Sequence, residues 1–262
     1  MLSSENLEKL RKAGRISGEA RELGLSLVAE GVKLYDVAQE VEGYIREHGC
    51  GLAFPCNISR NEIAAHYTPT CNDKTVFELG DVVKVDCGAE LDGFVGDTAG
   101  TVEVGTKRSI NRDGFVPIEN LCGHQIEQYN LHAGMSVPSY DSGDKQVIKA
   151  GMTVAIEPFA TDGKGYVVDG KFGNIVRLAR DKPVSDPKVQ EFLDYVKEEF
   201  HQFPFCARSC EFPDAEKHVR NLMRHGILAG YATLVEAGGG MVSQHEYTFY
   251  IDGHRGEVTT LP

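Results

Sequence analysis

An internal repeat limits the folds that this chain can adopt. Residues 79–86, LGDVVKVD, align without gaps on residues 150–157, AGMTVAIE. Glycine stands second in both copies, apolar residues alternate after it, and each copy ends in a carboxylate. Such alternation predicts strands. Eight positions could match through general strand preference alone, but the two terminal acids favour two equivalent strands that point their carboxylates at one centre.

The first copy is predicted to form the first strand of a hairpin. The run 81–86 is followed by the turn signal Asp-Gly at 92–93 and by a second β-prone run. We expect Asp86 to pair with Asp97, because the midpoint of these two numbers falls inside the proposed turn. Opposed carboxylates that are shielded from water need a proton or a cation. Lys84 could pair with one of them, which leaves a solvated acid pair as the simpler alternative.

A third strand candidate also carries an acid. In residues 241–251, MVSQHEYTFYI, Glu246 shares a face with Gln244, Thr248 and Tyr250. An acid within such a strand is unusual. Taken alone, it is more simply explained by an exposed strand face.

Histidines supply a nitrogen ligand for the same centre. The segment 123–132, GHQIEQYNLH, contains His124 and His132 between glycines, although a single histidine is usually a structural residue. Two aspartates, two glutamates and one imidazole make an oxygen-rich set. This set suits a pair of Mn, Fe, Co or Zn ions bridged by carboxylates better than a structural zinc.

Composition limits the class of protein. A chain of 262 residues can bury a sizeable core, and its net charge of −12 argues against a large nucleic-acid-binding face. The seven cysteines are odd in number and form no CxxC pair, which favours a reducing compartment. The N-terminal segment is charged and unlike a signal peptide, and no apolar run approaches the roughly 20 residues of a membrane span. We expect a soluble, cytoplasmic protein.

Helical periodicity appears at both ends of the chain. Ser4 is the expected cap of a first helix, and a second helix follows over residues 34–45, so that both would cover a sheet. Residues 186–200 and 214–225 predict two more helices, the first with Asp186 as its cap and Pro187 at its first position. The architecture is therefore mixed α and β.

Five motifs together resemble the type II methionine aminopeptidases of archaeal style. They are NEIAAHYTP, VDCGAELDGFVGDTAGTVEVG, GHQIEQYNLHAG, AIEPFAT and SQHEYTFYI, and they are specific as a set. The resemblance implies an α+β pita-bread fold with two pseudo-two-fold halves in a single catalytic domain, residues 1–262. It implies removal of the initiator methionine from nascent proteins through two divalent metal ions.

The resemblance also implies a role for each matching residue. The metal ligands would be Asp86, Asp97, His124, Glu157 and Glu246, with Glu246 bridging both ions. His66 would lie beside the substrate amine, His132 would steady the scissile carbonyl, and Glu157 could carry a proton to the leaving amine. The methionine side chain would be received by Phe54, Leu131, Phe159 and Tyr231.

Two segments bear on the type of enzyme. Residues 160–240 resemble the helical insertion of the type II class, although this insert could instead be a nucleic-acid or ribosome-docking module; its mixed charges argue against direct nucleic-acid binding. Between residues 105 and 115 the family carries a helix pair, and the nine residues here are too few for two helices of about 11 residues each. We therefore expect the second half to lack its helical cover.

Three functions remain open from the sequence. The leading one is a monomeric metallo-aminopeptidase that acts on peptides with N-terminal methionine and works near the ribosome. The second is a protein without catalysis, either a pita-bread binding protein or an internally truncated inactive family member. The third is a peptidase of the Xaa-Pro type. The complete set of five ligands favours the first, whereas the missing helices favour the second.

Overall fold

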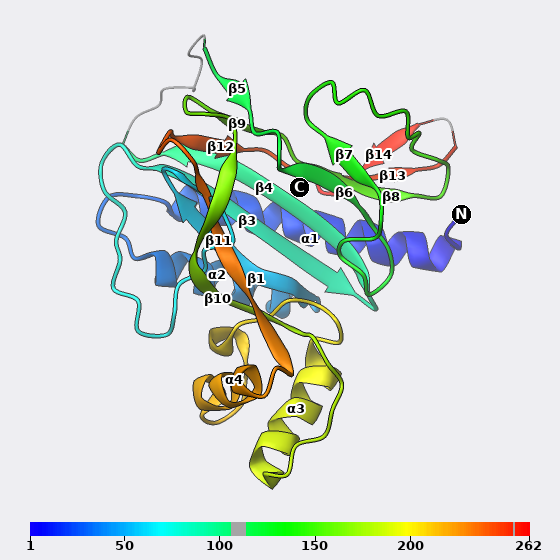
Figure 1. Ribbon diagram of the computed structural model, residues 1–262. Coiled ribbons are helices and arrows are strands. Elements are labelled where there is room, and N and C mark those ends of the chain that lie inside the picture. The colour runs from blue at the N-terminus through cyan, green and yellow to red at the C-terminus, as the bar shows by residue number, and fades with distance from the viewer. Residues whose placement is uncertain (106–113, 254) are drawn as a thin grey trace.

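The computed structural model describes residues 1–105, 114–253 and 255–262, and consists of helices and antiparallel strands (Figure 1). The helices are α1 (Ser4–Leu27), α2 (Leu34–Glu47), α3 (Pro187–Glu199) and α4 (Ala215–Arg224). The strands are β1 (Gly51–Arg60), β2 (Ile63–Ala65), β3 (Val82–Leu91), β4 (Phe94–Glu103), β5 (Val116–Pro117), β6 (Cys122–Ile126), β7 (Ser136–Pro138), β8 (Thr153–Ile156), β9 (Phe159–Thr161), β10 (Val167–Leu178), β11 (Leu228–Glu236), β12 (Val242–Gln244), β13 (Tyr247–Ile251) and β14 (Gly256–Val258). No helix in these ranges is both long and apolar enough to cross a bilayer.

The first half is a three-stranded sheet, β1-β3-β4, covered by α1 and α2. Apolar residues of both helices, among them Ile16 and Val41, pack on Val83 and Val85 of β3 in one buried cluster. The prediction that both helices cover a sheet is confirmed. The cap is one residue earlier than predicted, because the hydroxyl of Ser3 accepts from the backbone N–H of Asn6.

The β3–β4 register differs from the prediction by two residues. Asp86 pairs with Ala99, and Asp97 pairs with Gly88, so the two aspartates are diagonal neighbours. Asp92 and the glycine after it form a two-residue turn with positive φ at both positions, which centres the hairpin between them. The shift is even, so both aspartates keep the same face. Both are buried, and Lys84 Nζ donates to a backbone carbonyl oxygen at 2.9 Å, so the alternative of a solvated acid pair is wrong.

The repeat appears as two equivalent strands in two sheets. The second sheet has the order β14-β13-β8-β6-β7, and β8 takes the place that β3 has in the first. Gly80 and Gly151 precede these strands with φ of 87° and 86°. Their N–H groups donate to Val104 at the end of β4 and to Ile251 at the end of β13. The two halves therefore share backbone geometry as well as sequence.

Helical cover differs between the halves. Among the described residues, no helix pair comparable to α1 and α2 packs on the second sheet. The short connection over residues 106–114, where the family carries a helix pair that we expect this chain to lack, lies outside the described residues apart from Gly114.

The single strand predicted over residues 241–251 is two strands in two sheets. β12 pairs with β9, and β13 pairs with β8. The break falls at His245 and Glu246, where Glu246 forms an isolated bridge with Ala99 of β4. Period-two alternation alone did not reveal the break, because an alternating pattern continues across it.

The C-terminal segment packs closely on α1. A Cβ atom built on Gly14 would lie 2.3 Å from the carbonyl oxygen of Thr259, and one on Gly18 would lie 2.4 Å from that of Thr260. Glycine at these two helical positions allows the chain end to approach the helix backbone.

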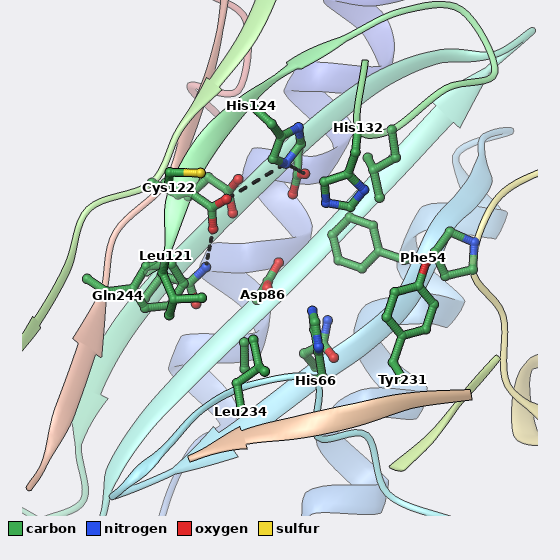
Figure 2. A pocket seen from close by; sticks show the side chains of 18 of the residues that line it. Phe54, His66, Asp86, Leu121, Cys122, His124, His132, Tyr231, Leu234 and Gln244 are labelled. Carbon is green, nitrogen blue, oxygen red and sulfur yellow. Dashed lines mark hydrogen bonds and ion pairs between the residues drawn. The ribbon is translucent and has the colours of Figure 1, made fainter. Parts of the chain in front are cut away.

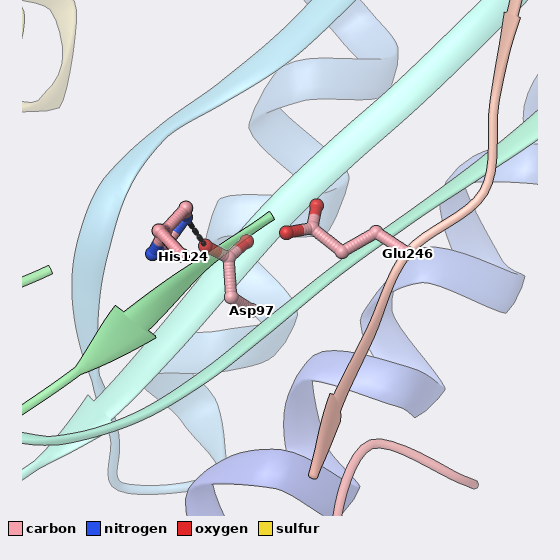
Figure 3. A group of neighbouring side chains, drawn as sticks. All are labelled: Asp97, His124 and Glu246. Atoms are coloured by element: carbon pink, nitrogen blue, oxygen red, sulfur yellow. Dashed lines mark ion pairs between the residues drawn. The ribbon is translucent and has the colours of Figure 1, made fainter. Parts of the chain in front are cut away.

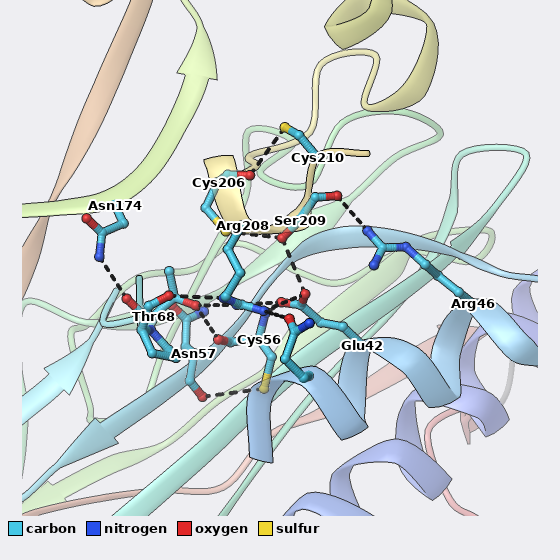
Figure 4. Close-up of polar contacts among 12 residues, drawn as sticks. Glu42, Arg46, Cys56, Asn57, Thr68, Asn174, Cys206, Arg208, Ser209 and Cys210 are labelled. Atoms are coloured by element: carbon cyan, nitrogen blue, oxygen red, sulfur yellow. Dashed lines mark hydrogen bonds and ion pairs between the residues drawn. The ribbon is translucent and has the colours of Figure 1, made fainter. Parts of the chain in front are cut away.

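Residues 187–224, called the helical segment here, contain α3 and α4 and have a core of their own. α3 and α4 pack through Phe192, Leu193 and Leu222 beside the paired strands β10 and β11, and Asp186 caps α3 as predicted. A buried ion pair between Arg208 and Glu42 of α2 connects this segment to the first half (Figure 4). Arg208 Nη2 lies 2.7 Å from Glu42 Oε1.

Candidate active site

Five side chains with metal-ligand chemistry converge on one cavity of 450 Å³. They come from both halves: Asp86 on β3, Asp97 on β4, His124 on β6, Glu157 directly after β8 and Glu246 directly before β13. The two copies of the repeat thus deliver Asp86 and Glu157 to the same cavity. The structure brings together all five residues that the sequence singled out, and their action as ligands stays a prediction.

Three of the five form the tightest group. Ligand atoms of Asp97, His124 and Glu246 all lie within 4.8 Å of one another (Figure 3). The Nε2 atom of His124 is 3.6 Å from Asp97 Oδ2 and 3.8 Å from Glu157 Oε1. These separations are too long for direct hydrogen bonds, and an ion could bind between the groups.

The electrostatics of the cavity favour a cation. Burial raises the pKa of Asp86 to about 7. Burial, followed by the charge of Asp86, raises the pKa of Asp97 well above its usual range, and burial with the charge of Asp97 does the same for Glu157 and Glu246. Four acids at such distances cannot all ionise without positive charge.

Unpartnered atoms support the same conclusion. Oδ1 of Asp86 and Oδ1 of Asp97 are buried and have no hydrogen-bond partner within the part of the chain that the structure describes. Carboxylate oxygens with one imidazole are ligands that divalent Mn, Fe, Co and Zn accept. The residues present therefore fit divalent metal ions.

Neutral histidines lie beside the acids. Burial lowers the pKa of His124 to about 4, with His132 adding to the effect, and burial also lowers the pKa of His66 and of His132. The rings of His124 and His132 have centroids 4.2 Å apart. His66 has φ of 64°, an uncommon backbone conformation for a non-glycine residue, and its Nδ1 lies 3.1 Å from the Ala232 carbonyl oxygen. The side chains of His66 and His132 point into the cavity in Figure 2.

Apolar side chains also line the cavity. All four predicted pocket residues are among them: Phe54, Leu131, Phe159 and Tyr231. The paired strands β10 and β11 and the segment after α3 add Ile175, Pro204 and Leu234, which the sequence did not single out. These residues are brought in by pairing between strands distant in sequence, and no local pattern marks them.

Two amide side chains in the cavity have no predicted role. The Nε2 of Gln244 donates to Glu157 Oε2 at 3.4 Å, and its Oε1 has no partner among the described residues. Asn57 of β1 lies across from Asp86. Its place in the cavity depends on a β-bulge, which the proline at position 55 within an apolar strand could have signalled.

Comparison with known proteins identifies the family. The model of metallopeptidase family M24 matches residues 8–113. The methionine aminopeptidase of Methanocaldococcus jannaschii is 39% identical over 290 aligned positions, which cover 98% of this chain and 99% of the relative. That of Saccharolobus solfataricus is 35% identical over 99% of both chains. These alignments are longer than the 262 residues of the chain, so it lacks positions that the relatives have.

Solved structures with the same fold are more distant in sequence. A thermophilic Arx1 has a TM-score of 0.86 at 16% identity and covers all of this chain, with 92% of that chain covered. The methionine aminopeptidase of Thermotoga maritima has a TM-score of 0.69 at 20% identity, with 100% and 98% covered. The prolidase of Pyrococcus furiosus has a TM-score of 0.57 at 15% identity, with 99% and 65% covered.

These structural likenesses establish the pita-bread fold, and the full-length sequence matches go further. A relative that is 39% identical over nearly the whole of both chains shows the family. The chain belongs to the methionine aminopeptidases of metallopeptidase family M24.

Proposed function

We propose that the protein removes the N-terminal methionine from nascent polypeptides by hydrolysing the first peptide bond. One observation carries the proposal. One cavity is lined both by the five metal-ligand side chains and by the apolar side chains of Phe54, Leu131, Phe159 and Tyr231. A substrate held with its side chain against the apolar residues would place its first peptide bond near the acids.

Two divalent ions, Mn, Co, Fe or Zn, would be held by Asp86, Asp97, His124, Glu157 and Glu246. When bound, they would supply an activated water near neutral pH and polarise the scissile carbonyl. Two ions are proposed because five ligands, four of them carboxylates that can bridge, exceed the needs of one tetrahedral site.

The protein's own groups would position the substrate and move protons. Glu157, with its raised pKa, would take up a proton and pass it to the leaving amine. His66 and His132 remain neutral because burial lowers their pKa, so each can donate one N–H to charge that develops on the carbonyl oxygen. Phe54, Leu131, Phe159 and Tyr231 would exclude water from an unbranched thioether side chain.

The setting of this activity is also proposed. We place a monomer in the cytoplasm, near ribosomes that supply its substrate, with residues 160–240 as a type II insertion in a single domain and no direct role in binding nucleic acid. All seven cysteines are free thiols, which supports a reducing compartment.

The test is methionine release from the peptide Met-Ala-Ser by metal-stripped protein, with and without added Mn(II) or Co(II). We expect metal-dependent release that Glu246→Ala abolishes and that Glu198→Ala, on the exposed side of α3, leaves unchanged. Cleavage of a Gly-Pro peptide instead would indicate an Xaa-Pro peptidase. A folded, metal-loaded protein that releases no methionine would indicate a non-catalytic or inactive member.

A further inference from the structure

A bulge in β1 turns one side chain into the cavity. On β1 the step from Phe54 to Asn57 is three residues, whereas the paired step on β3, from Gly88 to Asp86, is two. Pro55 lies within this bulge, where a missing N–H does not interrupt the pairing. In a regular strand, residues three apart would point to opposite faces.

The extra residue lets Phe54 and Asn57 line the same cavity. Cys56, between them, belongs to the buried cluster under α2, and its N–H donates to Glu42 Oε1 at 2.9 Å. Figure 4 shows Cys56 and Asn57 beside this network. Asn57 therefore lies near the apolar side chain of Phe54 on its own strand and opposite the carboxylate of Asp86 on β3.

The Asn57 side chain has an unmet acceptor. It is 5% exposed, and its Oδ1 has no hydrogen-bond partner in the described ranges. The donors of two other polar side chains go elsewhere: Lys84 Nζ donates to a backbone carbonyl oxygen, and Gln244 Nε2 donates to Glu157, so neither bond satisfies Asn57 Oδ1. A buried amide oxygen that points into a cavity is satisfied when a ligand brings an N–H group.

We propose that Asn57 binds the free α-amine of the substrate's first residue, an inference that rests on the proposed function. The other polar groups of an N-terminal methionine, its carbonyl oxygen and its thioether sulfur, are acceptors and cannot satisfy Oδ1. With the side chain against Phe54, the amine lies between Phe54 and Asp86, where Asn57 stands. Asn57 thereby selects chains with an unmodified N-terminus, because acylation removes donors and adds bulk at this point.

The experiment compares two ligands that are not hydrolysed. L-Methioninol carries the amine, and 4-(methylthio)butan-1-ol is the same molecule without it. Binding of each is measured calorimetrically to metal-free and to Mn(II)-loaded protein. We expect Asn57→Leu, which keeps the size of the side chain, to reduce the preference for methioninol about tenfold in both forms. Asn57→Asp, which keeps the acceptor, retains the preference.

Ser59→Ala is the matched control. Its hydroxyl is buried two residues further along β1, has no partner among the described side chains and backbone, and does not line the cavity. This variant should bind both alcohols as the native protein does. In Met-Ala-Ser hydrolysis, Asn57→Leu should raise KM and leave kcat nearly unchanged. The reason is that the hydrogen bond between Asn57 and the amine is equally strong in the bound substrate and in the transition state.

Two results would overturn the inference. An equal loss of affinity for both alcohols would mean that Asn57 only shapes the pocket. A fall in Mn(II) affinity of Asn57→Leu would make Asn57 a metal ligand instead. Failure of the proposed function is a separate outcome: native protein would release no methionine, while the preference for the amine could still be measured.

Discussion

The backbones of Glu246 and Ala99 pair through two hydrogen bonds, of 3.0 and 3.3 Å, and this bridge joins the two halves of the fold at the candidate metal centre. It fixes Glu246 beside the strand that carries Asp97. The next strand residue on the same side, Thr248, exchanges hydrogen bonds with Asp97, accepting its N–H and donating to its carbonyl oxygen at 2.8 Å. The acids from the two halves are therefore held by backbone contacts, and metal binding need not close the fold.

Gln244→Leu should weaken metal binding without unfolding the protein. The Gln244 amide donates to Glu157 and holds this carboxylate in place, and loss of such supporting hydrogen bonds typically costs about 10- to 100-fold in metal affinity. Calorimetric titration with Mn(II) measures the change. Ser243→Ala, one residue earlier on β12, is the control and should bind Mn(II) normally; unchanged affinity in Gln244→Leu would contradict the role.

Metal-free protein should lose stability as pH rises to neutrality. The pKa of Asp86 is raised to about 7 in the fold, whereas it is near 4 in an unfolded chain, so the folded state binds more protons between these values. The stabilisation is full below about pH 4 and is lost as pH rises to about 7. Thermal unfolding from about pH 5 to about pH 7 should show a falling Tm.

Two comparisons check this slope. Saturating Mn(II) should raise Tm most at about pH 8, because the cation replaces the missing protons. Asp86→Asn should flatten the slope of the metal-free protein. A Tm that rises with pH in the metal-free native protein would show that the acids are solvated.

Arg208→Met should destabilise the protein strongly. Both side chains of the Arg208–Glu42 pair are almost fully buried, and removal of one partner of a buried pair costs about 3 to 5 kcal/mol because the other charge is left uncompensated. Urea unfolding measures the loss. The double variant with Glu42→Met should recover part of it, whereas Arg220→Met, in the exposed pair with Glu216, should cost at most about 1 kcal/mol.

Gly14→Ala should be destabilising although alanine favours helices. The added Cβ would lie 2.3 Å from the Thr259 carbonyl oxygen, and overpacking of this kind costs about 1 to 3 kcal/mol. Gly43→Ala in α2 is the matched control, since nothing lies within 4 Å of its Cβ position. That variant should gain about 0.5 to 1 kcal/mol through helix propensity alone. A stabilised Gly14→Ala would mean that the chain end does not pack there.

The sequence predicts the elements and the acids better than it predicts how they meet. Helical spacing located four helices, and the repeat located two equivalent strands, because both signals are local. The hairpin register was wrong because a two-residue turn centred on 92–93 was placed one residue early. The sequence predicts one continuous strand over 241–251 because alternation persists where the chain leaves one sheet for another. Asn57 is not identified from the sequence because no strand is predicted over residues 51–60, and the β1–β3 register shifts twice before it reaches Asn57.

The ion pair between α2 and the helical segment has a consequence for how this enzyme can diverge. The acids stand on the two repeated halves, whereas Ile175, Tyr231 and Leu234 stand on the paired strands β10 and β11, between which the helical segment is inserted. Part of the cavity wall is thus encoded apart from the acids. Substitutions around Glu42 and Arg208 can therefore change the position of this part of the wall while the acids stay in place.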